Sequence, residues 1–388
     1  MVVYLKLKRK CFLKPVIRIK NIYSYISKNI LFTINIFVGV ALVLSNLAGH
    51  ISISQSSLIQ IFGLIYPIIL IINIVFLIFW IITKSKLAFF SLLIILLGFG
   101  NIINNFQITF FNKTNKQSHQ IKVLSYNVQN FKYKSSSSYS ETKSEIVNFI
   151  INQKPNIVCL QEYHSMANLF YQPLKDIRDS LNATTYYYES YFSRKNNQLS
   201  GLVIFSTYKV INKGRLKFDG SRTFGIFTDV IINSDTVRIF NIHFASTRLE
   251  PADIDFVVNP EMEDSKALKN RSIQIYYKLS QAYQLREKQL NYLIHKIEST
   301  TYEIILCGDF NDTPSSWVYN QLANELNDTF VKKGVGISST YAGPLPLLRI
   351  DYILTGKKIE TYGFTRYDIK KSDHYPISAI IEQNYSNK

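Results

Sequence analysis

The alternation of apolar and polar positions divides this chain into two parts. In the first part, three stretches contain no charged residue: 30–48, about 58–82 and about 87–108. A helix of about 20 apolar residues spans the hydrocarbon core of a bilayer, and three charge-free stretches in succession are unusual for the core helices of a soluble protein. We therefore expect three transmembrane helices within residues 30–110.

The second part, from residue 121 to residue 388, consists of short β-rich runs separated by turns. Strands are expected at 121–128, 156–161, 185–192, 201–206, 225–232, 236–244, 302–308, 350–354 and 377–382. Helical periodicity runs through 141–153, 166–181, about 271–298 and 315–325. Several neighbouring strands have no helix between them, which favours an α+β fold of two packed, mostly antiparallel sheets with helices outside.

Two segments carry no clear periodicity. Residues 111–120 are polar and form a short linker, whereas 246–270 form a long connection of a kind that usually covers a site. Cys159 and Cys307 each lie inside an apolar strand, so we expect buried free thiols. A disulfide between them requires their strands to be neighbours.

Charge is distributed unevenly along the chain. The net charge is +17, yet residues 1–120 hold 12 Lys or Arg and no Asp or Glu, while residues 121–388 hold 32 bases and 27 acids. This distribution indicates a membrane anchor with a basic leader at 1–29 more than a nucleic-acid-binding domain.

The positions of the basic residues predict the orientation in the membrane. Eight bases precede the first apolar stretch, the loop near 50–57 has none, and Lys84 and Lys86 lie in the second loop. Because basic loops stay in the cytoplasm, the leader is expected there. Three spans then place residues after about 110 on the periplasmic or extracellular side of an inner or plasma membrane.

Polar side chains gather where the expected strands end. They form six sets in chain order: Asn127; Gln161 and Glu162; Asn241 and His243; Asp309 and Asn311; Asp351; Asp373 and His374. Singly, each suits a turn, a cap or a satisfied core histidine. Together they are the residue types that bind hard cations and move protons, which indicates one active site.

The motifs Gly308-Asp309-Phe310-Asn311 and Ser372-Asp373-His374-x-Pro376, with the sets before them, resemble the endonuclease/exonuclease/phosphatase superfamily. That superfamily includes pancreatic-deoxyribonuclease-like nucleases, abasic-site endonucleases, inositol polyphosphate 5-phosphatases and neutral sphingomyelinases. The resemblance covers about 121–388 and implies a four-layer α/β/β/α sandwich with the site at one edge. It also implies Mg²⁺-dependent hydrolysis of phosphoesters.

The side chains suit that chemistry, because a divalent cation offsets the negative charge that repels an attacking hydroxide. Mg²⁺, with Mn²⁺ as a substitute, needs only one or two carboxylates and keeps several waters. The candidate ligands are Glu162, Asn127 and Asp373. The resemblance implies that Asp351 orients His374.

Other assignments concern water and phosphate. Asp309 and His374 are assigned jointly to activation of the attacking water. Asn311 is expected to donate a hydrogen bond to the phosphate, and His243 to act as a second donor or as the acid for the leaving oxygen. Asn241 is grouped with the substrate-binding residues.

The sequence predicts the type of reaction more closely than the identity of the substrate. A phosphodiesterase or endonuclease acting on nucleic acid is expected first, with Arg222 and Arg248 as substrate contacts. A second hypothesis is a phospholipid-directed phosphodiesterase or phosphatase, since membrane spans hold the site near lipid head groups. A third is an inactive membrane scaffold or receptor. No protein partner follows from the sequence.

Overall fold

The computed structural model describes residues 28–108, 119–132, 139–166, 171–193, 198–221, 223–258, 265–345 and 347–383. Most of the basic leader and of the expected linker at 111–120 lies outside the described residues.

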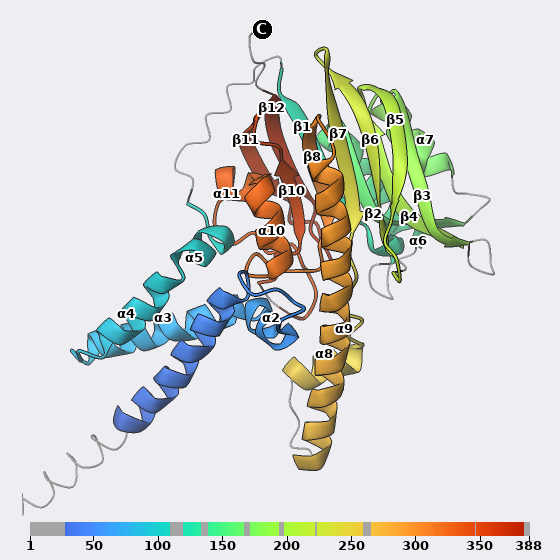
Figure 1. Cartoon of the computed structure of the whole chain (residues 1–388). Coiled ribbons are helices and arrows are strands. Elements are labelled where there is room, and N and C mark those ends of the chain that lie inside the picture. Colours follow the sequence, from blue (N-terminus) through green and yellow to red (C-terminus); the bar gives the residue numbers. More distant parts are fainter. Residues whose placement is uncertain are drawn as a thin grey trace, which may run out of the picture.

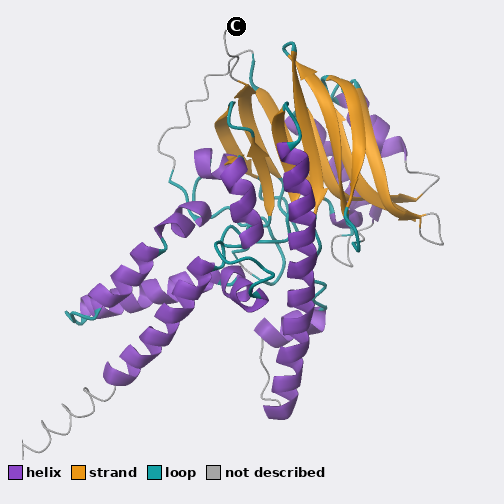
Figure 2. Cartoon of the chain, in the orientation of Figure 1, coloured by secondary structure: helices purple, strands orange, loops and turns teal. Residues whose placement is uncertain are grey.

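Two six-stranded sheets pack face to face (Figures 1 and 2). The first sheet contains β1 (Ile121–Asn127), β2 (Ile157–Met166), β3 (Thr185–Ser193), β4 (Gln198–Ser206), β11 (Ile359–Arg366) and β12 (Ile377–Gln383). The second sheet contains β5 (Lys209–Lys217), β6 (Phe224–Ile232), β7 (Asp235–His243), β8 (Glu303–Asp309), β9 (Asn327–Asp328) and β10 (Asp351–Thr355).

Both sheets are mixed. Their strand orders are β11-β12-β1-β2-β4-β3 and β5-β6-β7-β8-β10-β9. One central pair in each sheet is parallel, β1 with β2 and β7 with β8, and the remaining pairs are antiparallel. The parallel pairs follow from crossover helices, because a parallel connection needs a long return path.

Helices cover the outer faces of the sandwich. On the first sheet, α6 (Tyr139–Gln153) and α7 (Tyr171–Ser180) bury an apolar face that includes Ile146 and Ile150, one helical turn apart. On the second, α9 (Ser265–Glu298) and α10 (Trp317–Glu325) do the same. Aliphatic side chains of both sheets fill the space between them. The result is an α/β/β/α sandwich.

Every expected strand has a counterpart, but the sequence missed β5 and β11 and the short β9. Most of β5 is exposed, as befits an edge strand, so it lacks an apolar alternation. The expectation of an unstructured connection at 246–270 is wrong. It contains α8 (Pro251–Val258) and the start of α9, and Lys278 of α9 pairs with Asp253 at 2.6 Å. This ion pair with α9 stabilises α8, a helix that the periodicity of the sequence does not predict.

The apolar stretches near the N-terminus are helical, with one difference from expectation. The helix Lys28–Leu47 is long and apolar enough to cross a membrane. The other two stretches form bent pairs: α2 (Ser57–Leu64) with α3 (Tyr66–Ile82), at 62°, and α4 (Ala88–Leu97) with α5 (Phe99–Asn105), at 67°. Pro67 in the first turn of α3 and Gly98 between α4 and α5 are residues that favour such breaks.

The helix α2 packs on the catalytic sandwich. Buried Gln60 accepts a hydrogen bond from the backbone N–H of Trp317 at 3.1 Å, and the Thr313 hydroxyl donates to the Gly63 carbonyl at 3.0 Å. Arg349, which pairs with Asp328, also donates to the Asn104 carbonyl at 2.8 Å. The helical region is therefore joined to the segment that follows Asp309.

Candidate active site

The two central parallel pairs bring polar residues together at one end of the sandwich. Asn127, His243 and Asp309 are the last residues of β1, β7 and β8, and parallel strands end at the same edge. His243 is directly paired with Asp309 in the register of β7 and β8. The parallel pairing of these strands therefore brings the predicted polar residues to one edge of the sandwich.

Asp309 is buried at the centre of this group. Its carboxylate accepts hydrogen bonds from the Asn127 amide at 3.0 Å and from the backbone N–H of Asn311 at 2.8 Å. The preceding Gly308 has φ +150°, and a Cβ there would collide with the backbone carbonyl of Ile242. Glycine at this position therefore lets β8 approach β7 closely enough to aim the carboxylate.

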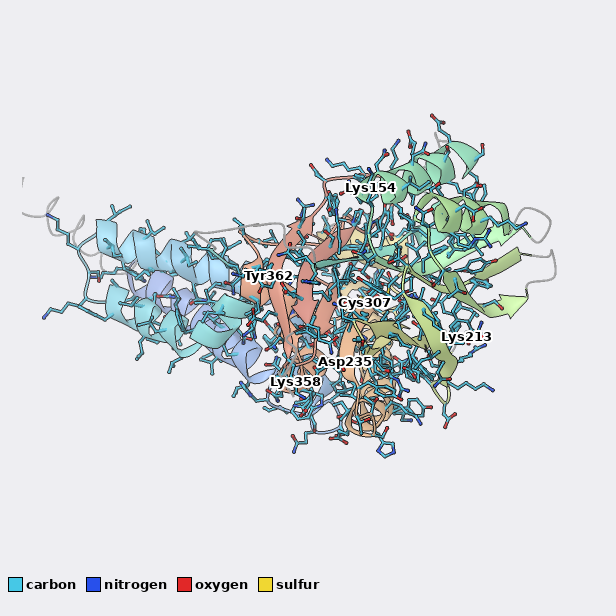
Figure 3. All side chains as sticks on the ribbon, turned by 90° about the horizontal axis from the view of Figure 1, so that it is seen from above. Lys154, Lys213, Asp235, Cys307, Lys358 and Tyr362 are labelled. Atoms are coloured by element: carbon cyan, nitrogen blue, oxygen red, sulfur yellow. The ribbon has the colours of Figure 1, made fainter. Side chains whose placement is uncertain are left out.

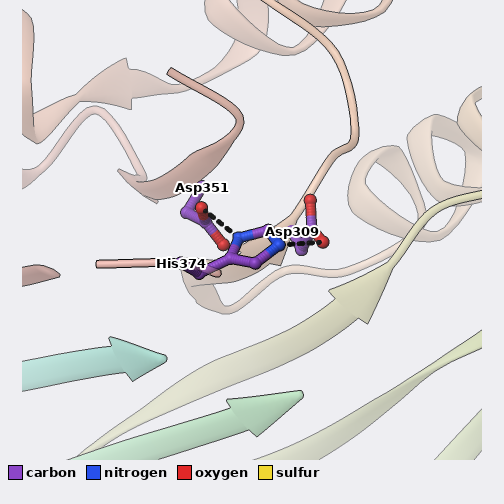
Figure 4. Close-up of side chains that lie close together, drawn as sticks. All are labelled: Asp309, Asp351 and His374. Carbon is purple, nitrogen blue, oxygen red and sulfur yellow. Dashed lines mark hydrogen bonds and ion pairs between the residues drawn. The ribbon is translucent and has the colours of Figure 1, made fainter. Parts of the chain in front are cut away.

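His374 and Asp351 form a hydrogen-bonded pair, with His374 Nδ1 at 2.8 Å from Asp351 Oδ2 (Figure 4). His374 Nε2 points toward Asp309 Oδ2 at 3.7 Å. Burial alone would lower the pKa of His374, but the carboxylates of Asp351 and Asp309 outweigh it, so that the pKa lies well above its usual value. Burial also raises the pKa of Asp351 to about 6, although His374 opposes this shift.

His243 is held by a residue that the sequence did not single out. The hydroxyl of Tyr191 lies 2.8 Å from His243 Nδ1, and the same hydroxyl oxygen accepts from the backbone N–H of Glu162. Burial raises the pKa of Tyr191 well above its usual value. The other ring nitrogen of His243, Nε2, faces Asp309 at 3.6 Å and Glu162 at 3.8 Å.

Glu162 reaches the site from a β-bulge. The register between β2 and β4 shifts between Leu160 and Tyr163, and Glu162 has a left-handed φ of +52°. Its carboxylate accepts a hydrogen bond from the Asn130 amide at 2.7 Å, and Ser200 donates to Asn130 at 2.6 Å. A strained residue supported by two neighbours is typical of a functional position.

Comparison with protein families identifies this arrangement. The model described as Endonuclease/Exonuclease/phosphatase family matches residues 124–374, more than half of the chain. The chain belongs to the endonuclease/exonuclease/phosphatase family. A second model, a domain of unknown function (DUF8431), matches residues 28–106. A comparison with curated proteins finds no match.

Solved structures of the family share the fold. An endonuclease/exonuclease/phosphatase from Beutenbergia cavernae DSM 12333 is 14% identical with a TM-score of 0.50, over 69% of this chain and 72% of that one. ANGEL2, a 2′,3′-cyclic phosphatase in complex with adenosine-2′,3′-vanadate, is 13% identical with a TM-score of 0.50, over 69% and 96%. At this identity the likeness shows the fold alone.

The site suits a divalent cation, and the chain is a metal-dependent phosphoric ester hydrolase of this family. Glu162, Asp309, Asp351 and Asp373 converge, while His374 and His243 are the facing groups able to carry positive charge. Burial raises the pKa of Asp373, and the nearby carboxylates of Glu162 and Asp309 raise it further. Such mutual repulsion is relieved by a cation.

Two sets of side chains are candidate ligands for that cation. One ligand atom from each of Asp309, Asp351 and His374 lies within 4.8 Å of the others, whereas the sequence pointed to Glu162, Asn127 and Asp373. We favour Glu162, because its side chain remains 27% exposed and faces the opening, while His374 already engages one oxygen of Asp351.

Asn241, one of the three predicted substrate contacts, lies in the interior of the sandwich. The Asn241 side chain is fully buried and donates to the carbonyls of Leu160 at 3.0 Å and Val203 at 2.9 Å. It also accepts from the Gln161 amide at 2.8 Å. Asn241 therefore ties the two sheets together, and its assignment to substrate binding is wrong.

Of the two arginines predicted to contact substrate, only Arg248 is among the described residues, and it does not line the hollow over the site. Arg248 is exposed on the connection after β7 with a left-handed φ of +53°, beside residues that line the site but not among them. Arg222 lies outside the described residues. Asn311 lines the site, and its amide donates to the Phe244 carbonyl at 3.1 Å, which leaves its second N–H available.

A hollow of about 230 Å³ opens over these residues. Its polar side comprises Glu162, His243, Asp309, Asn311, Asp373 and His374. Its other side comprises Leu64, Leu249, Ile254, Leu345, Leu348 and Ile350, with Ser246, Thr247 and Tyr341 between. Spacing along the chain gave no signal for this apolar side, because its members come from α2, from α8 and from two irregular loops.

Proposed function

We propose that this protein is an integral, multi-pass membrane enzyme that uses Mg²⁺, or Mn²⁺ in its place, to hydrolyse a phosphoester. The observation that carries the proposal is that Glu162, Asp309 and His374 line one hollow, with Asp351 bonded to His374 behind them. A carboxylate–histidine pair facing a second carboxylate suits proton transfer from water. Carboxylates at the opening suit a hard cation.

Each residue then has a stated part in the reaction. Glu162, with Asn127 and Asp373 near it, holds the cation, whose charge stabilises the negatively charged transition state. Asp309 and His374 together take the proton of the attacking water, and Asp351 fixes the orientation of the imidazole. As the water oxygen bonds to phosphorus, the ester bond breaks and the leaving oxygen takes the Nε2 proton of His243 in its imidazolium form, which returns to neutral imidazole.

The experiment uses the full chain in nanodiscs, because α2 is hydrogen-bonded to the catalytic part. Hydrolysis of bis-4-nitrophenyl phosphate is measured with Mg²⁺, with Mn²⁺ and with a chelator. We expect turnover that requires the cation and that Asp309→Asn reduces at least 100-fold. Cation-independent turnover, or full activity of Asp309→Asn, would contradict the proposal. Asp219→Asn, on an exposed turn, is the matched control.

The membrane topology is part of the same proposal. The helix Lys28–Leu47 and the two bent pairs each cross the bilayer, and residues after about 110 lie on the extracytoplasmic side. The basic leader and the pair Lys84 and Lys86 support this orientation. An alkaline phosphatase fusion after residue 120, which is active only outside the cytoplasm, should be active. An inactive fusion that is produced at normal levels would reverse the orientation.

Nucleic acid becomes a less favoured substrate than it was from the sequence. A groove for nucleic acid needs Lys or Arg along the phosphate path. Among the residues that the structure describes, those that line the hollow include neither. Nicking of plasmid DNA is therefore a comparison arm of the substrate experiments.

A further inference from the structure

The apolar side of the hollow has no part in the hydrolysis described above. Leu64, Leu249, Ile254, Leu345 and Leu348 are half-buried, so each still presents carbon surface to the opening. Water against such a surface is unfavourable, and a ligand that replaces it gains about 25 cal/mol for each Å² of apolar area buried. A site that handled only small charged esters would have no use for this wall.

The apolar wall continues into the helices that we assign to the membrane. Leu64 is the last residue of α2, and Ile65 and Ile68 beyond it are 39% and 42% exposed. From the other direction, Ile254 lies in α8, where Val257 and Val258 are 52% and 46% exposed. An apolar path therefore reaches the hollow from both of its borders.

The arrangement of the molecule agrees with this path. Figure 1 shows α8, the first half of α9 and the apolar helices α3 and α4 extending to the same side of the sandwich, the side on which the strands of the site end. The opposite end of the sandwich carries charged turn residues, among them Lys154, Asp235 and Lys358 (Figure 3). The apolar helices α3 and α4 thus extend from the end of the sandwich that holds the site and not from the opposite end.

We propose that the substrate is a phosphoester attached to a long apolar chain and drawn from the bilayer in which the helices sit. The inference rests on the proposed function and names the substrate class of that same site. The phosphate meets Glu162, Asp309 and His374, while the chain lies against Leu64, Leu249 and Leu348. The absence of Lys and Arg from the described lining fits a substrate with one reacting phosphate and an apolar remainder.

The test compares esters that differ only in their apolar part. Full chain in phosphatidylcholine nanodiscs is given methyl 4-nitrophenyl phosphate or octyl 4-nitrophenyl phosphate, below the concentration at which the octyl ester aggregates. Each methylene that leaves water contributes about a fourfold gain in binding. We expect kcat/KM for the octyl ester to exceed that for the methyl ester by at least about 100-fold. Equal values would overturn the inference, whereas cleavage of neither ester would refute the proposed function itself.

Substitutions on the apolar side of the hollow test whether that side accounts for the higher kcat/KM of the octyl ester. Leu64→Ser and Leu348→Ser should each lower the octyl-to-methyl ratio about fivefold or more, with the melting temperature recorded to exclude unfolding. Leu58→Ser, on the same helix α2 but 54% exposed and outside the hollow, should leave the ratio unchanged. Ratios unaffected by both wall variants would overturn the assignment. Two variants from different segments keep the test valid where one of them fails to fold.

The source of the chain is tested with a diacylglyceryl 4-nitrophenyl phosphate placed in the same nanodiscs. Release of nitrophenol from this embedded ester supports a bilayer substrate. An inert embedded ester beside a rapidly cleaved octyl ester would overturn the bilayer source and indicate a free amphiphile. Plasmid DNA cleaved faster than the octyl ester would overturn the substrate class.

Discussion

The polar and apolar sides of the hollow are held in place in different ways. On the polar side, Asp309, Glu162 and His243 are each held by a hydrogen bond to a residue of another segment: Asn127, Asn130 and Tyr191. On the apolar side, Leu64 is the last residue of α2, so its position depends on how α2 docks, and Leu348 comes from a loop. The polar side is therefore a rigid part for the chemistry, and the apolar side is an adaptable part for choosing what is bound.

The largest expected effect is the loss of kcat when a residue at the centre of the polar side is replaced. His374→Ala removes the group that bridges Asp351 and Asp309, and we expect kcat to fall about 10²–10⁴-fold. Initial rates with bis-4-nitrophenyl phosphate measure the loss, and a melting curve checks the fold. The matched control is His295→Ala, an exposed histidine of α9, which should keep its activity. Substantial residual activity in His374→Ala would remove His374 from the reaction.

A second change acts on the polar side without touching the proton path. Glu162→Gln keeps the size of the side chain and one acceptor oxygen, which can still accept from Asn130, but loses the charge. Weaker cation binding should raise the Mg²⁺ concentration for half-maximal rate on the order of 10–100-fold. Saturating Mg²⁺ should restore much of the rate. Glu298→Gln, at the exposed end of α9, is the control. An unaltered Mg²⁺ titration would exclude Glu162 as a ligand.

The contact between α2 and the sandwich supports the apolar side of the hollow, so breaking this contact tests how that side is held in place. The Gln60 side chain donates to the carbonyls of Ala48 and Ile51, both at 2.9 Å, and accepts from Trp317. Gln60→Ala leaves these buried groups unpaired and should lower the free energy of unfolding by about 1–3 kcal/mol. Thermal unfolding in nanodiscs measures it, and exposed Gln55→Ala is the control. Equal stability of the two variants would mean that α2 docks without help from Gln60.

The smallest expected effect concerns the orientation of His243. Tyr191→Phe removes the hydroxyl that lies 2.8 Å from Nδ1, and with it the hydrogen bond that orients the imidazole. We expect kcat to fall about tenfold, the worth of one well-placed hydrogen bond. Tyr277→Phe, which changes a residue 60% exposed on α9, should have no effect. If Tyr191→Phe also left kcat unchanged, His243 would be oriented by its strand alone.

The rigid side of the site was largely predictable from the sequence, and the adaptable side was not. Asp309, His243 and Asn127 terminate apolar strands, so periodicity and strand ends locate them. Glu162 was recognisable as a residue type, but the bulge that turns it was not. Tyr191 is one of four tyrosines in β3, so nothing in the sequence distinguishes it from the others. Leu64 and Leu348 are ordinary apolar residues whose common surface exists only in three dimensions.

The same limit explains the errors. Asn241 has the chemistry of a ligand-binding residue, but two backbone carbonyls of the facing sheet occupy its amide. The bend between α2 and α3 was not predicted either, because the uncharged α2 buries polar Gln60 in a protein interface that composition does not reveal. In both places the decisive partner lies far away in the chain.

The bulge at Glu162 makes strand β2 sensitive to length as well as to residue type. Opposite the single residue Leu202 of β4, β2 supplies both Gln161 and Glu162, so one residue can bind between the sheets while the next faces the opening. Removing either position would let the strands pair regularly and would leave the later pairs, such as Tyr163 with Gly201, unchanged. The deletion would instead remove the left-handed residue that aims a carboxylate at the opening, so the sheet would survive while the site would lose Glu162.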